Sequence, residues 1–241
     1  MIVVTMTSWT KRIGNVKRVV ESIMNNTVKP DRLYLNLSKT EFDGIELPKD
    51  LVDYFNSDER LVINWVDGPN TKPMKKVFPI LEYLSDDDII IDADDDILFP
   101  KDLIESRIKD FNTFDGKYSI SSNISTSVGF SGKMKVVSAV SLFQKKMLNN
   151  WEKFVSDTVM HTYNDDRTYL TLMWLNGYTN KSCTKWYVKE LLAKFGINDN
   201  YSMRENKVHT IGKRYDMVVN DDFKKRNGVN IMDSFGYYEK L

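Results

Sequence analysis

The chain has 241 residues, of which 41% are hydrophobic and 12% aromatic, and this is enough for the core of one large α/β domain or of a domain with an appended lobe. Its 34 basic and 34 acidic residues balance, so no overall positive field favours nucleic acid. The single cysteine, Cys183, excludes an internal disulfide framework and fits a reducing compartment.

Strands and helices are expected to alternate over the N-terminal part of the chain. Short apolar or alternating runs predict strands, and apolar residues at helical spacing predict helices. In chain order we expect a strand at 2–6, a helix at 15–24, a strand at 32–37, a short helix at 50–55, a strand at 61–66 and a helix at 75–84. This alternation is typical of a parallel sheet with crossover helices.

An apolar run at residues 89–91 leads directly into four aspartates. The three isoleucines predict a strand that is buried on both faces, and ligands bind at the carboxyl edge of open α/β sheets. The aspartates that follow are Asp92, Asp94, Asp95 and Asp96. Carboxylates this close repel one another and need a counter-charge, most simply a divalent cation. The sequence therefore predicts a metal site here, with a solvated acidic turn as the plainer alternative.

Two other acidic motifs fit this stretch poorly. A calcium loop of the EF-hand type that starts at Asp92 needs Gly at its sixth position and Glu at its twelfth, but Ile97 and Leu103 stand there. The pattern of an aspartyl-phosphate phosphatase has Thr or Val two residues after the second Asp, near the start of the chain. Here that position is Asp96, in mid-sequence.

The later part of the chain is less regular. We expect a helix at 102–111 that Asp102 helps to cap, strands near 118–120 and 136–140, a flexible segment at 125–135 between these strands, and helices at 143–155 and 166–175. The flexible segment is inferred from its glycine and serine content. The tail from residue 194 onward is polar and weakly periodic.

Two groups of residues precede the acidic strand and suit an anionic ligand. Thr5, Ser8 and Arg12 lie in and after the first strand, where a loop can present backbone donors and an arginine to a nucleotide. Lysines at 72, 75 and 76 form a cationic cluster, which a diphosphate needs opposite a metal. A solvated helix face is the alternative, and we favour Lys72 or Lys76 over Lys75.

Two later groups also carry chemistry. Asp165 and Asp166 precede the helix expected at 166–175, and two adjacent carboxylates exceed what a helix cap requires. One of them could act as a general base on an alcohol. Of the two histidines, His209 lies beside further cations such as Lys213, so it is a better candidate than His161 for a third metal ligand or a phosphate contact.

In three stretches the chain resembles a nucleotide-sugar glycosyltransferase of the GT-A fold, especially the small family-2-like bacterial enzymes that build capsule and lipopolysaccharide. Residues 3–12 are similar to the first strand and nucleotide-binding loop of that family. Residues 72–76 and 89–100 resemble the region of its Asp-x-Asp motif, with the usual apolar and proline residues after it. Residues 164–166 are similar to its later acidic pair, and together these stretches span roughly residues 1–175.

The resemblance implies transfer of a sugar from a nucleoside-diphosphate donor, with UDP-sugar as first choice, to a hydroxyl of a glycan or lipid-linked acceptor in surface polysaccharide synthesis. Mn²⁺ or Mg²⁺ would neutralise the leaving diphosphate. Both Asp92-x-Asp94 and Asp94-x-Asp96 fit the motif, and we prefer Asp94 toward the ribose and Asp96 on the metal. The implied metal ligands are Asp94, Asp96 and His209. The implied donor-binding residues are Thr5, Ser8, Arg12, Asp67, Lys72, Lys76, Asp94, Asp95 and Lys213.

The later acidic pair takes the catalytic role in this interpretation. Asp166 would be the base of an inverting enzyme, with Asp165 as the other candidate, because the pair reads Asp-Asp instead of the commoner Glu-Asp. In a retaining enzyme Asp166 would orient the acceptor or stabilise charge. A late histidine completes the metal shell in some retaining relatives, and His209 is similar to it.

We therefore expect a single GT-A α/β domain over residues 1–241, with a mostly parallel, Rossmann-like sheet and flanking helices. Residues 1–100 would form the donor half, and residues 101–241 the acceptor half and a tail, with 125–135 as a mobile loop near the acceptor. A sugar-nucleotide nucleotidyltransferase is the alternative enzyme, although only Gly14 is found where its glycine-rich phosphate loop would lie. A metal- or carbohydrate-binding module is the non-catalytic alternative.

The sequence also indicates where in the cell the protein is expected. The N-terminus has neither a basic region nor a long apolar run, and no segment reaches the roughly 18 apolar residues of a membrane span. We therefore expect a cytoplasmic protein. The basic run at 224–226 and the aromatic residues at 235–238 would suit peripheral contact with anionic lipid at the inner membrane face, although an exposed helix face and a docking tail are the simpler explanation.

Overall fold

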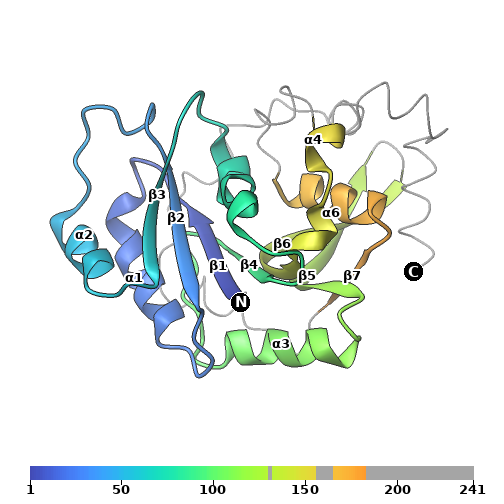
Figure 1. The fold of residues 1–241 in the computed structure, drawn as a ribbon. Coiled ribbons are helices and arrows are strands. Elements are labelled where there is room, and N and C mark those ends of the chain that lie inside the picture. Colours follow the sequence, from blue (N-terminus) through green and yellow to red (C-terminus); the bar gives the residue numbers. More distant parts are fainter. Residues whose placement is uncertain (130–131, 156–164, 183–241) are drawn as a thin grey trace.

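The computed structural model describes residues 1–129, 132–155 and 165–182 (Figure 1). The elements in chain order are β1 (Ile2–Thr7), α1 (Ile13–Met24), β2 (Arg32–Ser38), α2 (Lys49–Asn56), β3 (Leu61–Val66), η1 (Lys72–Lys76), η2 (Phe78–Tyr83), β4 (Ile89–Ala93), α3 (Leu103–Thr113), β5 (Tyr118–Gly129), β6 (Gly132–Gln144), η3 (Lys145–Leu148), α4 (Trp151–Phe154), α6 (Asp165–Leu175) and β7 (Thr179–Ser182), where η marks a 3₁₀ helix. None of the helices in these ranges is long and apolar enough to cross a bilayer.

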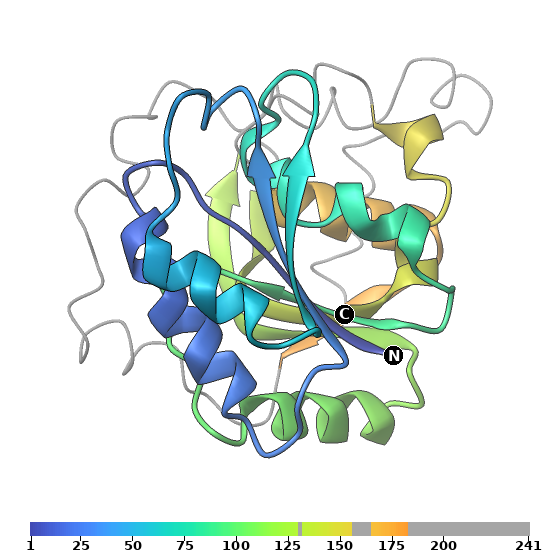
Figure 2. The ribbon, with the colours of Figure 1, turned by 60° about the vertical axis from the view of Figure 1, so that its left-hand side comes forward.

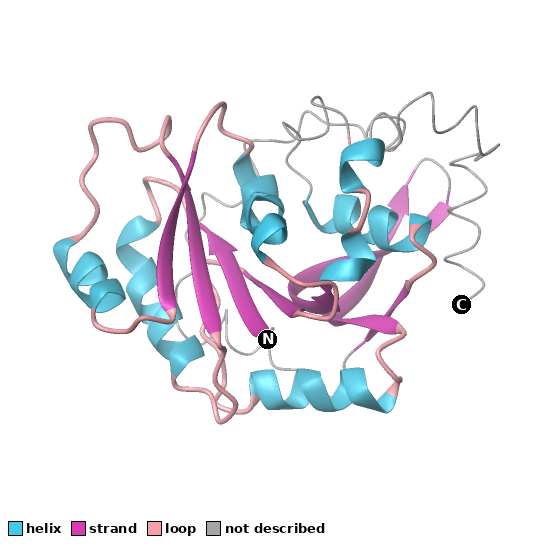
Figure 3. Ribbon diagram, in the orientation of Figure 1, coloured by secondary structure: helices cyan, strands magenta, loops and turns pink. Residues whose placement is uncertain are grey.

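The seven strands form one mixed sheet in the order β3-β2-β1-β4-β6-β5-β7 (Figure 3). Strands β3, β2, β1 and β4 are parallel neighbours. Strand β6 runs antiparallel to both β4 and β5, and β7 runs parallel to β5. Only β6 is therefore reversed among the described strands, so the sheet is mostly parallel, as the sequence predicts.

The connections place one set of elements on each face of the sheet. Helices α1 and α2 link β1, β2 and β3 on one face, whereas η1 and η2 return the chain from β3 to β4 across the other face (Figures 1 and 2). The first three strands are thus added in one direction from β1 to β3, and the next strand, β4, is added on the opposite side of β1. The neighbouring carboxyl ends of β1 and β4 form the topological switch point, where open α/β sheets bind ligands.

Burial in the hydrophobic core and the strand bounds confirm the elements expected at 15–24, 61–66 and 89–91. In α1, Val16, Val19, Val20 and Ile23 are fully buried, so the face predicted from helical spacing is the face that packs on the sheet. In β4, Ile90 and Ile91 are also fully buried, as expected for a strand covered on both faces. Strand β3 matches the predicted range of 61–66.

The helix expected at 75–84 is wrong. Its place is taken by η1 and η2, which meet at Val77. The physical reason is Pro79, which cannot donate a backbone hydrogen bond and disfavours the α conformation at Phe78 before it. The 3₁₀ turns still bury Ile80 and Leu81, so the predicted apolar face is present in a different helix type.

The flexible segment expected at 125–135 is also wrong. Its described residues belong to β5 and β6, which pair in one long antiparallel hairpin with Ser125 opposite Val136 and Gly129 opposite Gly132. Strand pairing satisfies the hydrogen-bonding groups of the backbone whatever the side chains are. It therefore overrides the weak preference of serine and glycine for loops. The mobility and acceptor role proposed for this segment stay predictions.

Of the three helices predicted in the later part of the chain, two are confirmed and one is wrong. The helix expected at 143–155 is wrong, because β6 runs on to Gln144 and is followed by η3 and the short α4. Asn150, at φ 60°, adopts a left-handed conformation that separates these two elements. Helices α3 and α6 confirm the predictions at 102–111 and 166–175, although Asp102 stands at the start of α3 without a capping side-chain hydrogen bond. The tail from residue 194 lies outside the described residues.

Candidate active site

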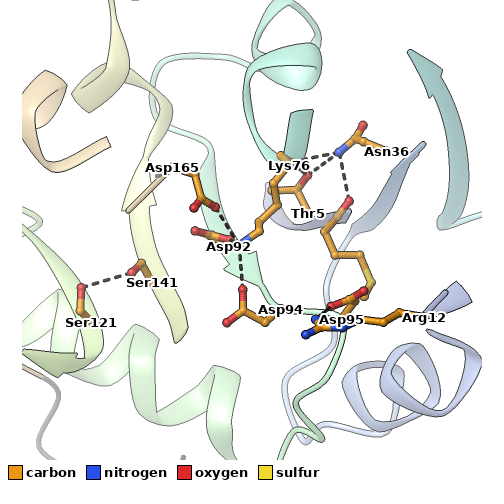
Figure 4. Close-up of polar contacts among 11 residues, drawn as sticks. Thr5, Arg12, Asn36, Lys76, Asp92, Asp94, Asp95, Ser121, Ser141 and Asp165 are labelled. Atoms are coloured by element: carbon orange, nitrogen blue, oxygen red, sulfur yellow. Dashed lines mark hydrogen bonds and ion pairs between the residues drawn. The ribbon is translucent and has the colours of Figure 1, made fainter. Parts of the chain in front are cut away.

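Charged side chains gather at the switch point between β1 and β4 (Figure 4). The loop after β1 supplies Ser8 and Arg12, and the end of β4 supplies the aspartates at 92 and 94–96. Lys76 comes from the last position of η1, and Asp165 from the first position of α6. Four segments that are distant in sequence therefore meet at one edge of the sheet.

Lys76 lies at the centre of three carboxylates. Its Nζ atom is 3.0 Å from Asp92 Oδ1, 2.8 Å from Asp94 Oδ1 and 3.1 Å from Asp165 Oδ2. Asp94 accepts a hydrogen bond from this ammonium, and Asp92 and Asp165 hold it as ion pairs. The Lys76 side chain is only 7% exposed, so these pairs are weakly screened by solvent.

Arg12 forms a second cationic centre beside the first. Its Nη1 atom donates a 2.6 Å hydrogen bond to Asp95 Oδ1, and Nη2 is 3.2 Å from Asp96 Oδ2. Ser8 donates to the other oxygen of Asp95 at 2.6 Å. Asp95 is buried and has both oxygens occupied by the β1 loop, so we infer that it shapes the site from within.

The cluster carries more negative than positive charge. Within the described residues five carboxylates surround Lys76 and Arg12, and the charge of Lys75 also acts on Asp95. Burial adds to the cost of ionising Asp92, Asp95 and Asp96. Burial, followed by the charges of Asp165 and Asp94, raises the pKa of Asp92 to about 7, although Lys76 opposes the shift. Burial and the charge of Asp94 raise the pKa of Asp96 to about 6. A further cation would relieve this imbalance.

Exposure separates the aspartates into two kinds. The side chains of Asp94 and Asp96 are 35% and 19% exposed, whereas that of Asp92 is 4% exposed. An incoming ligand would therefore meet Asp94 and Asp96 first, while the buried Asp92 forms an ion pair with Lys76. This pattern supports Asp94-x-Asp96 as the ligand-facing register.

The donor set fits a divalent cation that shares its shell with a ligand. Mg²⁺ and Mn²⁺ prefer oxygen donors, and Mg²⁺ is usually held by one or two carboxylates plus phosphate oxygens. Asp94 and Asp96 provide such oxygens in a cluster with surplus negative charge. Within the described ranges no three His, Cys, Asp or Glu side chains form a ready-made cage, so the remaining ligands would have to come from a bound diphosphate, from water or from elsewhere in the chain.

Amide and hydroxyl side chains also lie beneath the charged cluster, and of these the sequence analysis named only Thr5. Asn36 on β2 and Thr5 on β1 both donate hydrogen bonds to the backbone carbonyl of Lys76, and Asn64 on β3 donates to Asn36. The polar row continues on the other side of Asp92, where Ser141 pairs with it across the strands and contacts Ser121. The sequence shows at Asn36 only a single amide within an apolar strand, and this does not reveal that the side chain is buried or what it bonds.

Some predicted site residues lie elsewhere or are not described. Asp67 follows β3, is 80% exposed and pairs with Lys39, so the structure does not bring it to the cluster. Lys72 begins η1, where its backbone N–H donates to Asn70 and its carbonyl accepts from Lys75 Nζ. Asp166 lies in α6, but its side chain is not among the described ones. His161, His209 and Lys213 lie outside the described residues.

The fold is that of the GT-A glycosyltransferases, in agreement with the sequence resemblance. Residues 1–349 of S. aureus TarS match with a TM-score of 0.56 and 10% identity over 78% of this chain and 59% of that one. The same TarS segment in complex with UDP-GlcNAc matches with a TM-score of 0.55. The mannosyltransferase PcManGT from Pyrobaculum calidifontis, in complex with GDP-Man and Mn²⁺, matches with a TM-score of 0.53 and 15% identity over 77% of this chain and 54% of that one.

These matches establish the fold alone, because the identities are low. This chain spans 59% of the TarS 1–349 segment, 36% of the longer TarS chain and 54% of PcManGT. No protein-family model and no curated protein matches the sequence.

Proposed function

We propose that this protein is a metal-dependent glycosyltransferase that moves a sugar from a nucleoside-diphosphate donor to an alcohol. The observation that carries the proposal is the interleaving of Lys76 and Arg12 with the aspartates of β4 at the switch point of a GT-A sheet. A diphosphate leaving group develops charge as the glycosidic bond breaks, and fixed cations at that place stabilise it. UDP is our first choice of nucleotide, and UDP-GlcNAc is the donor bound in one structural neighbour.

The residue roles follow from exposure and charge. Asp94 and Asp96 would hold Mn²⁺ or Mg²⁺ together with the donor phosphates, and His209 remains a proposed further ligand. The bound metal would supply Lewis-acid stabilisation of the leaving diphosphate. Lys76 would keep Asp94 in place and present a positive charge close to the phosphates. Thr5, Ser8, Arg12 and Asp95 would shape the nucleotide side of the site, with Lys72, Asp67 and Lys213 proposed as outer contacts.

The base is proposed within the pair at the start of α6. Asp165 reaches the cluster and is 3.1 Å from Lys76 Nζ, whereas Asp166 follows it on the helix. We keep Asp166 as the proposed base of an inverting reaction and Asp165 as the other candidate. The contact of Asp165 with Lys76 favours a supporting role for it, because its carboxylate is already engaged in holding that ammonium.

The acceptor and the setting are proposed on the sequence resemblance alone. They are a hydroxyl of a glycan or lipid-linked saccharide in surface polysaccharide synthesis, in the cytoplasm and with peripheral contact to the inner membrane face. Residues 1–100 would bind the donor, and residues 101–241 would shape the acceptor side.

Calorimetric titration of UDP tests the proposal. We expect binding in Mn²⁺ that is lost in chelator, and Asp96→Ala should weaken the metal-dependent binding at least tenfold because the metal loses one of two protein oxygens. Asp53→Ala is the control, since Asp53 is an exposed carboxylate on α2 that pairs with Lys49 and should leave UDP binding unchanged. If neither UDP nor any other nucleoside diphosphate binds in the presence of metal, the proposal is wrong.

Turnover assays separate the alternatives. A glycosyltransferase should release UDP slowly from its donor by hydrolysis in the presence of metal. A nucleotidyltransferase would instead need pyrophosphate or a nucleoside triphosphate, and a binding module would release nothing.

A further inference from the structure

The backbone of Lys76 is anchored to the sheet by two side chains. Thr5 Oγ1 donates a hydrogen bond to the Lys76 carbonyl oxygen, and Asn36 Nδ2 donates to the same oxygen at 3.0 Å. Both side chains are fully buried. The Lys76 carbonyl ends η1, where a helix leaves its last carbonyls without partners, so β1 and β2 supply the missing donors.

The orientation of the Asn36 amide is fixed by its neighbours. Thr5 gives its hydroxyl proton to Lys76, so its oxygen can only accept, and it does so from Asn36 Nδ2 at 2.9 Å. The Lys76 carbonyl can likewise only accept. The Asn36 NH₂ group must therefore face both atoms, while its carbonyl oxygen accepts from Asn64 Nδ2 at 2.7 Å. Asn36 Nδ2 also donates to the Met6 carbonyl at 3.3 Å, and a flipped amide would break all four contacts.

This anchor matters because the rest of Lys76 is intrinsically mobile. Its side chain has four rotatable carbon–carbon bonds, and η1 is a five-residue 3₁₀ segment with poor hydrogen-bond geometry of its own. Nevertheless, Nζ lies within 3.1 Å of three carboxylates from β4, its following loop and α6. A fixed starting point on the sheet limits where the ammonium can go.

We propose that Asn36 is a positioning residue, which sets the place of Lys76 and through it the arrangement of Asp92, Asp94 and Asp165. Asn36 is itself fully buried beneath the cluster, so in this proposal it acts on the site through the Lys76 carbonyl that it bonds. The effect of Asn36 on nucleotide binding rests on the function proposed above, whereas its effect on the position of the Lys76 ammonium does not. The test therefore measures the exposure of Lys76 and the affinity for nucleotide separately.

The first readout is chemical labelling of lysines by acetic anhydride, followed by mass spectrometry, in metal-free protein. The exposed Lys49 is the internal reference. In Asn36→Ala we expect Lys76 to be acetylated at least fivefold faster than in the wild type, because its ammonium is no longer held among the carboxylates. Asn26→Ala is the matched control, because Asn26 is also buried and bonds the main chain, donating to the Ser22 carbonyl and accepting from the Ile104 N–H. It lies just beyond the C-terminal end of α1, whereas the cluster residue Arg12 precedes the N-terminal end. Its removal should leave Lys76 labelling unchanged.

The second readout is UDP affinity by calorimetry. Asn36→Ala should weaken binding several-fold, and the same change in a Lys76→Met background should weaken it no further, because a residue that acts through Lys76 has nothing left to position. Additive losses, or Lys76 labelling that is equal in Asn36→Ala and Asn26→Ala, would overturn the proposal. If wild-type protein binds no nucleotide, the proposed function fails, and the labelling comparison still decides the role of Asn36.

Discussion

Replacing Lys76 with methionine should destabilise the protein by about 3–5 kcal/mol at pH 8, the usual cost of removing one partner from a buried ion pair. The ammonium contacts three carboxylates, and methionine keeps the volume but leaves their charges facing one another. Nucleotide binding should be strongly weakened but still measurable in the same variant, because Asp94 no longer has the contact that holds it. Urea unfolding at pH 8 and calorimetry with UDP measure the two effects.

Lys75→Met is the matched control for this prediction. Lys75 is equally buried, but its ammonium is 3.4 Å from a single carboxylate, that of the less deeply buried Glu41. Burial lowers the pKa of Lys75, which indicates that its charge is itself costly in the fold. We expect less than half the loss of stability seen for Lys76→Met, and no loss of nucleotide binding. Equal losses in the two variants would show that the contacts of Lys76 with the cluster have no special importance.

The parallel half of the fold could be predicted from sequence because each element has its own periodic signal. The buried valines of α1 and the isoleucines of β4 reveal their faces without knowledge of the partners. The β5–β6 hairpin could not be predicted in this way. Its middle is held by backbone pairing, such as Ser125 with Val136, and side-chain composition carries little information about that pairing.

The site was predictable only in part, for a similar reason. A run of aspartates after a buried strand indicates a charged edge, and Arg12 and Lys76 were found as cations that could lie near it. The sequence does not show which cation contacts which carboxylate, because those distances depend on how η1 and α6 pack on the sheet. Asn36 was missed because a single polar residue in a strand has no pattern; only the hydrogen bond to the Lys76 carbonyl gives it a role.

Metal-free protein should become less stable as pH rises from 5 to 7.5. The cause is Asp92, whose pKa burial raises to about 7 from an ordinary value of 3.8. Between these two values the folded state keeps a proton that the unfolded state releases, so each rise in pH favours unfolding. The pKa shift corresponds to a fall of about 2 kcal/mol across this window. Asp96, with its pKa raised to about 6, should add to the same slope.

Urea unfolding in chelator at pH 5, 6 and 7.5 measures this slope, and Asp92→Asn should remove most of it, because the amide is neutral throughout. Asp58→Asn is the control, since hydrogen bonds from Arg60 lower the pKa of Asp58 to about 2. A lowered carboxyl pKa contributes stability that is lost only as pH falls below about 4, outside the window. Parallel profiles for wild type and Asp92→Asn would contradict the prediction, because Asp92 would then be ionised throughout the window and Lys76 would fully compensate its charge.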